Sequence, residues 1–194
     1  MRIEARVLEN AWVRCEPLSE VVRDEVRAAI AGDAAAWSIM VSNGHGEAFD
    51  AWFDQRVAHM EAGGGPAYAV RRRRDGRIAG TSSLHDLVLA HRRVELGSTV
   101  FHPDARGTEV NPASKRLLLE HAFASGIIRV EIITDAVNAR SQAAIARLGA
   151  TREAVLRRHK ITWTGRVRDT VMFAITDEDW PRVRDGLDAR LAAF

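Results

Sequence analysis

The sequence of 194 residues is poor in cysteine, tyrosine and lysine, with one Cys, one Tyr and two Lys. The single cysteine, Cys15, excludes an internal disulfide framework and favours a reducing compartment. No run of about 18 apolar residues occurs, so we expect no membrane-spanning helix. The first residues lack the apolar core of a secretion signal, and we therefore expect a cytoplasmic protein.

The composition that remains is that of an ordinary globular protein. Hydrophobic residues make up 46% of the chain and charged residues 28%, which is enough to bury a core and argues against disorder. No internal repeat, low-complexity tract or linker stands out in the sequence. We therefore expect one domain over residues 1–194.

Charge is unevenly distributed along the chain, although the net charge is only +2. Residues 1–66 carry six arginines against eleven acidic residues, whereas residues 67–194 carry 22 basic against 15 acidic residues. Nearly all of the basic residues are arginines, whose planar fork of donors suits phosphate. The basic part therefore favours an anionic ligand or a nucleic acid, or else it reflects a compositional habit of the source genome.

Hydrophobic periodicity and turn residues predict strands and helices along the whole chain. Strands are predicted at 7–18, 68–73, 77–84, 94–102, 127–134, 151–162 and 167–175, and helices at 19–30, 47–62, 111–123, 138–148 and 176–191. The predicted N-caps are Ser19, Asn111, Asn138 and Thr176. This order of elements predicts an α+β fold with a mixed sheet.

The segment richest in chemical signals is a strand, a short loop and a helix within residues 94–123. A loop that brings backbone N–H groups to a helix N-terminus forms an anion site. Gly107 permits a close approach of the backbone to a ligand, and Arg106 adds a forked cation. The same spacing also fits an ordinary turn between a strand and a helix.

Three segments jointly resemble the GNAT superfamily of N-acetyltransferases, in the Rim-type branch of ribosomal-protein-alanine acetyltransferases. They are Arg106–Asn111 with its helix, Asn138–Ala150 and Arg168–Val171. The resemblance covers nearly the whole chain. It implies the GNAT fold, with a mixed central sheet of about seven strands, acetyl-CoA as the donor, an amine as the acceptor, and the homodimers common among relatives.

The resemblance also implies which residues bind acetyl-CoA. They are Val100, Phe101, Arg106, Gly107, Thr108, Glu109, Val110, Asn111, Asn138, Arg140 and Arg147. Glu109 stands where relatives usually have a small residue, and a carboxylate that faced a pyrophosphate would be repelled. We expect its side chain to turn outward while its N–H still donates, the alternative being weak binding of CoA. Asn138 also fits a plain N-cap, and both arginines also fit solvated helix residues.

Transfer of an acetyl group to nitrogen requires a neutral amine and a proton for the departing thiolate. Strand alternation predicts that Glu95 shares a face with Gly97, Thr99 and Phe101. In the resembled family, a Glu at this position lies near the acceptor and draws its proton, often through water. The alternative for Glu95 is a carboxylate satisfied at a strand edge.

The proton for the leaving group is the second catalytic requirement. Many relatives in the superfamily use a tyrosine on a later helix, but the one tyrosine here, Tyr68, is predicted in the first hairpin strand. Ser141 matches a serine of the Rim-type branch, and its hydroxyl would hydrogen-bond the CoA sulfur. The alternative is that Ser141 is only a residue of the first helical turn.

These expectations combine into direct transfer of acetyl from acetyl-CoA to a primary amine, on a protein N-terminus or a small molecule. Cys15 is predicted away from the site, so a ternary complex fits better than an acetyl-cysteine intermediate. The alternative function is a non-catalytic acyl-CoA sensor or interaction module on the same fold. Because the first 66 residues are acidic, we expect an acidic acceptor groove that suits a cationic amine.

Neither a metal nor a further macromolecular partner is expected. The seven histidines show no metal-ligand spacing, so no metal site is predicted. The run Arg71–Arg74 lies on a predicted strand, where only alternate side chains share a face. We therefore expect neither a nucleic acid nor a membrane as a partner.

Overall fold

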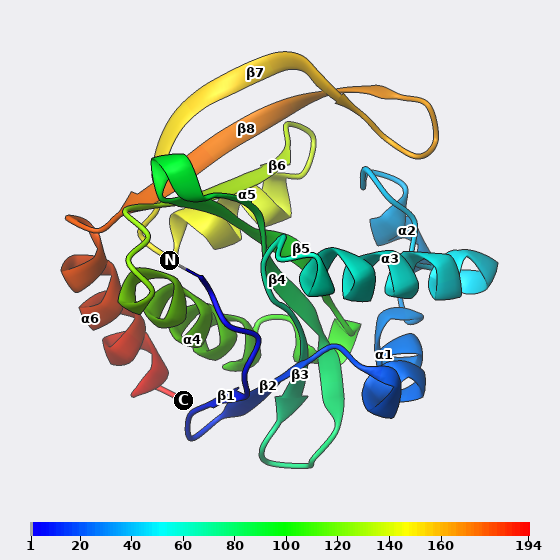
Figure 1. Ribbon diagram of the computed structural model, residues 1–194, viewed down its shortest axis with the longest axis horizontal. Helices are drawn as coiled ribbons and strands as arrows, with labels where there is room; N and C mark the ends of the chain where they lie inside the picture. Colours follow the sequence, from blue (N-terminus) through cyan, green and yellow to red (C-terminus); the bar gives the residue numbers. More distant parts are fainter. Residues whose placement is uncertain (1) are drawn as a thin grey trace.

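Residues 2–194 of this computed structural model form one twisted sheet with helices on both faces (Figure 1). The strands are β1 (Leu8–Glu9), β2 (Val13–Pro17), β3 (Ala67–Arg72), β4 (Ile78–Val88), β5 (Arg93–Phe101), β6 (Arg129–Asp135), β7 (Thr151–Ile161) and β8 (Val167–Thr176). The α-helices are α1 (Arg23–Ile30), α2 (Ala34–Trp37), α3 (Phe49–Glu61), α4 (Val110–Ala124), α5 (Ala139–Ala146) and α6 (Trp180–Leu191). The predicted α+β class with a mixed sheet is confirmed, with eight strands instead of about seven.

The sheet has the order β1-β2-β3-β4-β5-β6-β8-β7, and only β5 and β6 pair in parallel. A parallel pair needs a crossover connection, and α4 supplies it between these two strands. The long β7–β8 hairpin arches along one edge of the sheet and its tip reaches toward α2 (Figure 1). The indole N–H of Trp163 in this tip donates to the carbonyl oxygen of Trp37 at 2.7 Å.

The parallel pair opens near the middle of the sheet. Strands β5 and β6 pair only from Arg93 with Arg129 to Glu95 with Glu131, although both strands continue further. Beyond this point Ser98 has a φ of +49°, and the register between β4 and β5 shifts. Such a β-bulge reverses the side-chain alternation and bends the strand. The two strands therefore part and leave a gap between them.

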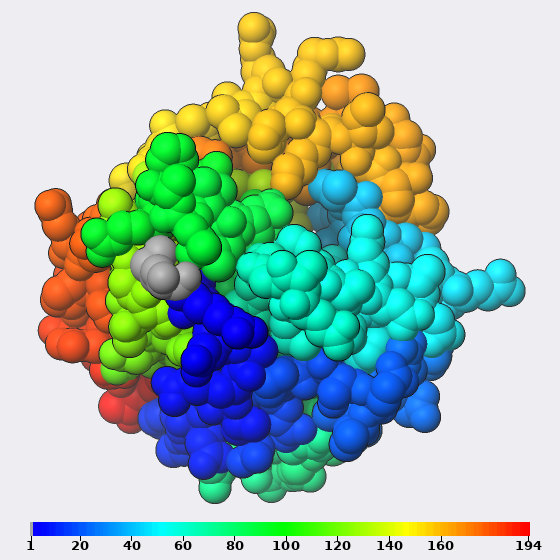
Figure 2. Space-filling model, viewed as in Figure 1, coloured from blue at the N-terminus to red at the C-terminus, as the bar shows by residue number. Residues whose placement is uncertain are grey.

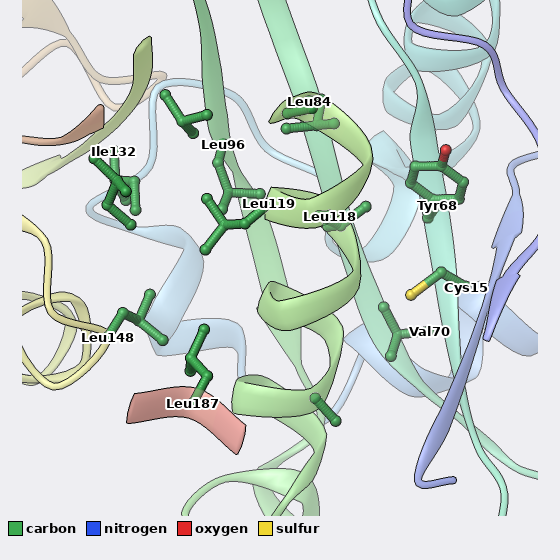
Figure 3. Packing of buried hydrophobic residues seen from close by; sticks show 14 of the residues in the cluster. Cys15, Tyr68, Val70, Leu84, Leu96, Leu118, Leu119, Ile132, Leu148 and Leu187 are labelled. Atoms are coloured by element: carbon green, nitrogen blue, oxygen red, sulfur yellow. The ribbon is translucent and has the colours of Figure 1, made fainter. Parts of the chain in front are cut away.

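Side chains that alternate along the strands feed a separate core on each face of the sheet. In β3, Tyr68 and Val70 face the core under α4, α5 and α6, whereas Ala67 and Ala69 face the core under α1, α2 and α3. Figure 3 shows α4 lying across the first core, where it contributes the fully buried Leu118 and Leu119. Two covered faces fix the register of the sheet, and so they fix the position of the gap.

The first predicted strand, residues 7–18, is wrong in one respect. The chain reverses at Asn10, whose Oδ1 accepts from the backbone N–H groups of Trp12 and Val13 at 3.0 Å. The segment therefore forms two antiparallel strands, β1 and β2. This Asn-based turn accounts for the additional strand.

Three of the predicted helix starts also need correction. Helix α4 begins at Val110 with Glu109 as its N-cap, so Asn111 and Pro112 lie inside the first turn. Helix α6 begins at Trp180, and Thr176 instead closes the preceding turn by bonding with Asp179. Ser19 precedes a short 3₁₀ helix but its side chain makes no capping bond. Within the described residues, no helix is long and apolar enough to cross a membrane.

Candidate active site

A cavity of about 650 Å³ opens where β5 and β6 part. Its walls come from β5, β6, the loop before α4, the start of α5, and the segment from α2 to α3. Most of the residues predicted for the site line it. They are Glu95, Val100, Phe101, Arg106, Gly107, Thr108, Asn111, Asn138, Arg140, Ser141 and Arg147.

Two predicted residues do not line the cavity, and both have a physical reason. Val110 is fully buried in the core beneath α4. The carboxylate of Glu109 lies 3.9 Å from Arg74 Nη1, away from the cavity. The side chain thus points in the outward direction expected for it, and a repulsive charge is kept out of the cavity.

The loop before α4 has the features of an anion site. Gly107 has a φ of +77°, and a Cβ on it would meet open space. Within the described residues, the backbone N–H groups of Gly107, Thr108 and Glu109 donate no hydrogen bond. The first N–H groups of α4 also lack intrahelical partners because no turn precedes them. A pyrophosphate fits these free donors at a helix N-terminus.

The guanidinium of Arg106 does not stand free beside this loop. Its Nη1 donates to Asp33 Oδ2 at 2.6 Å and its Nε donates to the carbonyl oxygen of Phe101 at 3.2 Å. The bond from Arg106 is the main reason that the pKa of Asp33 is lowered. Arg106 therefore reaches the cavity with part of its fork already engaged, which the sequence did not indicate.

Helix α5 begins at the opposite wall of the cavity. Asn138 is its N-cap, and its Oδ1 accepts from the backbone N–H of Ser141 at 3.0 Å. This bond leaves the side-chain amide N–H groups of Asn138 and the hydroxyl of Ser141 available to a ligand. Arg140 in this helix and Arg147 at its C-cap line the cavity from exposed positions.

The bulge in β5 overturns one prediction about Glu95. Alternation predicts one face for Glu95, Gly97, Thr99 and Phe101, but Ser98 reverses the alternation between residues 97 and 99. The hydroxyl of Thr99 consequently accepts from Lys115 on α4, whereas Glu95 lies beside His85 on the opposite face. A residue with positive φ inside a strand is rarely visible in sequence unless it is glycine.

Glu95 stands in a group of three titratable side chains that the sequence did not indicate. His85 lies across from it on β4, with Nε2 at 3.5 Å from Glu95 Oε1 and Nδ1 at 3.5 Å from Asp86 Oδ2. Burial raises the pKa of Glu95, and the attraction of His85 opposes that rise. Because strand pairing brings residues 85 and 95 together, chain spacing alone could not reveal the group.

Gly97 provides the space that Glu95 occupies. A Cβ at residue 97 would lie 2.8 Å from His85 Nε2 and 2.9 Å from Glu95 Oε1. The carboxylate therefore folds over Gly97, toward the bulge. His85, Asp86 and Glu95 also have ligand atoms within 4.8 Å of one another, so the prediction of no metal site, which rested on histidine spacing, remains a prediction.

The described part of the acidic first 66 residues contributes no carboxylate to the cavity wall, and the carboxylates beside the predicted acceptor groove, Asp86 and Glu95, come from β4 and β5 instead. The acidic residues of α1 and α3 lie on the outer surface, where Arg23 and Arg27 pair with Asp50 and Arg23 also pairs with Asp54. Among the described residues, the wall contributed by residues 36–67 contains no Asp or Glu. The net charge of a segment did not predict the face on which its charges lie.

The single cysteine and the single tyrosine both lie in the core. Cys15 and Tyr68 are fully buried and neither lines the cavity (Figure 3). The four arginines of residues 71–74 are divided among separate carboxylates, for example Arg71 with Glu16 and Arg73 with Glu9. They do not form one continuous basic surface.

The acetyltransferase (GNAT) domain family matches residues 16–151. No curated protein sequence matches the chain. Among solved structures, a GCN5-related N-acetyltransferase from Brucella melitensis is 25% identical, with a TM-score of 0.87 over 97% of this chain and 86% of that chain.

Two more distant structures share the fold. RimJ from Mycobacterium smegmatis in complex with CoA-disulfide is 19% identical, with a TM-score of 0.83 over 98% of this chain and 97% of that chain. The ribosomal-protein-S5-alanine acetyltransferase from Vibrio fischeri is 14% identical, with a TM-score of 0.74 over 90% of this chain and 98% of that chain. At these identities the likeness concerns the fold alone.

Proposed function

This chain belongs to the acetyltransferase (GNAT) domain family and is an acetyl-CoA-dependent acyltransferase; we propose that it transfers acetyl directly to a primary amine in a ternary complex. The observation that carries this proposal is the cavity between β5 and β6. Its lining includes both Glu95 and the loop before α4, whose free N–H donors suit an anion. Both substrates can therefore occupy it together, whereas Cys15 lies outside it.

The CoA part of the cavity is assigned to the α4 loop and the start of α5. The backbone N–H groups of residues 107–109 would hold the pyrophosphate, and the Asn138 amide would donate to the pantetheine arm. Arg140 and Arg147 would add positive charge near the phosphates. The free donors in the loop support this assignment.

Glu95 is assigned as the base for the acceptor amine. The amine nitrogen forms a bond to the thioester carbonyl carbon, the C–S bond breaks, and the amine proton passes to Glu95 directly or through a water. Burial raises the pKa of Glu95, which brings its basicity nearer to that of an amine. His85 lies beside the carboxylate, with its Nε2 at 3.5 Å from Glu95 Oε1.

Ser141 is assigned as the donor to the sulfur of CoA as that atom gains charge. Replacing Ser141 with Ala is expected to lower kcat by about tenfold, because one hydrogen bond to the developing thiolate is lost. Affinity for acetyl-CoA should change little, since the cap from Asn138 uses the backbone N–H of residue 141. Steady-state kinetics and calorimetry measure the two quantities.

A matched variant controls for the loss of any serine hydroxyl. Ser125 bonds the carbonyl oxygen of His121 at the end of α4 and does not line the cavity. Ser125→Ala should therefore keep the wild-type kcat. An unchanged kcat in Ser141→Ala would remove Ser141 from the mechanism.

The class of acceptor is proposed from the fold and the sequence resemblance. The fold shared with RimJ and with the S5-alanine acetyltransferase supports a Rim-type enzyme that acts on an α-amine. An α-amino group is partly neutral at pH 7, so it needs less help from a base than a lysine amine does.

The proposed function is tested by release of CoA in the presence of acetyl-CoA and a panel of amines. The panel contains protein N-terminal peptides, amino acids, polyamines and aminoglycosides. We expect amine-dependent CoA release together with acetylated product found by mass spectrometry. The absence of measurable acetyl-CoA binding in calorimetry would contradict the proposal.

A further inference from the structure

Arg56 of α3 places a guanidinium inside the acceptor half of the cavity. Its Cζ lies 4.5 Å from the ring centroid of Trp52, which fixes the plane of the fork. Nη1 donates to Ser98 Oγ at 2.8 Å and Nη2 donates to Ser42 Oγ at 3.3 Å. The side chain is thus held in place by one ring and two hydroxyls.

Among residues 2–194, no carboxylate forms an ion pair with this guanidinium. Only two of the five N–H donors of the guanidinium are engaged, and Nε is buried without a partner. Burial alone lowers the pKa of Arg56 to about 10, and no carboxylate acts against it. The other arginines near this wall, such as Arg23 and Arg27, pair with carboxylates on the outer surface. Arg56 is partly exposed, but its Nε is buried, and an unpaired cation with buried donors is costly unless a ligand supplies the anion.

The guanidinium of Arg56 and the proposed base both lie over β5. Ser98, which accepts from Arg56, follows Gly97 in the chain, and the carboxylate of Glu95 folds over Gly97. The two groups of opposite charge thus lie over adjacent residues of β5. A short molecule with an amine at one end and an anion at the other can reach both groups.

We propose that Arg56 binds a carboxylate of the acceptor, so that the preferred acceptor is a primary amine with a carboxylate within a few bonds. The inference rests on the proposed function and names the substrate class of the same site. A planar guanidinium binds a carboxylate through two parallel hydrogen bonds to its two charged oxygens. A neutral amide has one acceptor oxygen and no charge, so it cannot replace the carboxylate in this contact. Trp37, Trp52 and Met40 line the same part of the cavity and provide apolar surface for the remainder of the molecule.

Binding of matched acids and amides tests this inference. The protein with saturating CoA is titrated by calorimetry with N-acetylglycine, N-acetyl-L-leucine and N-acetyl-L-phenylalanine, each beside its amide. A second arm uses N-acetyl-Ala-Asp-amide beside N-acetyl-Ala-Asn-amide, which separates a free amino acid from a peptide with an acidic second residue. We expect at least one acid to bind about 10- to 100-fold more tightly than its amide.

Variants decide whether Arg56 is the cause of the preference. Arg56→Gln should remove the preference and leave affinity for the amide within about threefold, since only the charged contact is lost. Arg56→Lys keeps the positive charge but loses the planar set of donors, so it should retain a smaller preference for the acid. It also tests the contact if Arg56→Gln does not fold. Arg152→Gln, at an exposed position on β7, should keep the full preference.

Two results would overturn the inference. One is that no acid binds more tightly than its amide to the wild-type protein. The other is that the preference survives in Arg56→Gln. Because the titration needs no turnover, an absence of acetyl transfer would contradict the proposed function separately.

Discussion

Replacement of Glu95 with Gln is expected to lower kcat/KM by about 100- to 10,000-fold, the range typical for loss of a general base. The carboxylate lies in the acceptor half of the cavity, over Gly97, and it makes no contact with the α4 loop assigned to CoA. Affinity for acetyl-CoA should therefore stay near that of the wild-type protein. Steady-state kinetics measures kcat/KM, and calorimetry measures the affinity for acetyl-CoA.

The pH profile provides a second signature of Glu95. The base acts in its deprotonated form, so activity rises as the pH passes its pKa. Burial raises the pKa of Glu95, and the acidic limb of kcat/KM is therefore expected above the value of about 4.3 for an ordinary Glu. This limb should be absent in Glu95→Gln. If Glu95→Gln kept the same acidic limb as the wild-type protein, the limb would belong to another group.

A matched variant separates catalysis from the loss of a buried carboxylate. Glu131 pairs with Glu95 across the β5–β6 ladder, is also partly buried, and bonds Arg93 and Arg129 instead of lining the cavity. Glu131→Gln should keep the wild-type kcat and pH profile. If both variants lost activity equally, the role of Glu95 would be structural.

Lys115 is expected to make the stability of the protein depend on pH above neutrality. This lysine is buried, and its ammonium donates to the hydroxyls of Ser82 and Thr99 at 2.8 and 2.6 Å. Burial lowers its pKa to about 7, whereas an unfolded lysine titrates near 10.4. Above pH 7 the unfolded state binds the extra proton, so the free energy of unfolding rises with pH. The rise is about 2 kcal/mol between pH 7 and pH 8.5.

Cys15 is expected to make the free energy of unfolding fall with pH at higher pH, the opposite of the effect of Lys115. Burial raises the pKa of its thiol, so above about pH 8.5 the native state holds a proton that the unfolded state has released. This contribution to stability is complete below the unfolded pKa and is lost as the pH rises. The total profile should therefore rise from pH 7 and flatten above pH 8.5.

Urea denaturation between pH 6.5 and pH 9.5 measures both effects. Lys115→Met should remove the rise of stability with pH. It should also increase the free energy of unfolding by about 2–4 kcal/mol at pH 7, because the buried amine is gone and Ser82 and Thr99 still bond each other at 3.0 Å. Cys15→Ala should extend the rise beyond pH 8.5. Lys160→Met, which changes the other lysine, should leave the slope intact. A flat wild-type profile would show that Lys115 is not buried as a neutral amine.

Much of the α4 loop and of α5 could be predicted from the sequence. Local rules identify Asn138 as a cap, and the structure confirms it. Local rules were less accurate for α4, where they placed the N-cap at Asn111, two residues after the observed cap Glu109. A Pro in the first turn marks a helix start, but it does not specify which of the first positions it occupies.

The acceptor half of the cavity could not be predicted in the same way. Arg56, His85 and Glu95 come from α3, β4 and β5, and strand pairing and helix packing bring them together. The acidic composition of the first 66 residues indicated a groove for cations. Helix packing turns those carboxylates outward and leaves Arg56 as the charged residue of that wall.

The sequence by itself determined the α+β class, the family resemblance and the position of the loop proposed to bind CoA, because each depends on residues that are close in the chain. The tertiary structure alone decided where β5 and β6 part, which face Glu95 occupies and which charge faces the acceptor. These features depend on the bulge at Ser98, on pairing between strands and on packing of α3. Residues distant in the chain set all three, and local pattern does not encode their contacts.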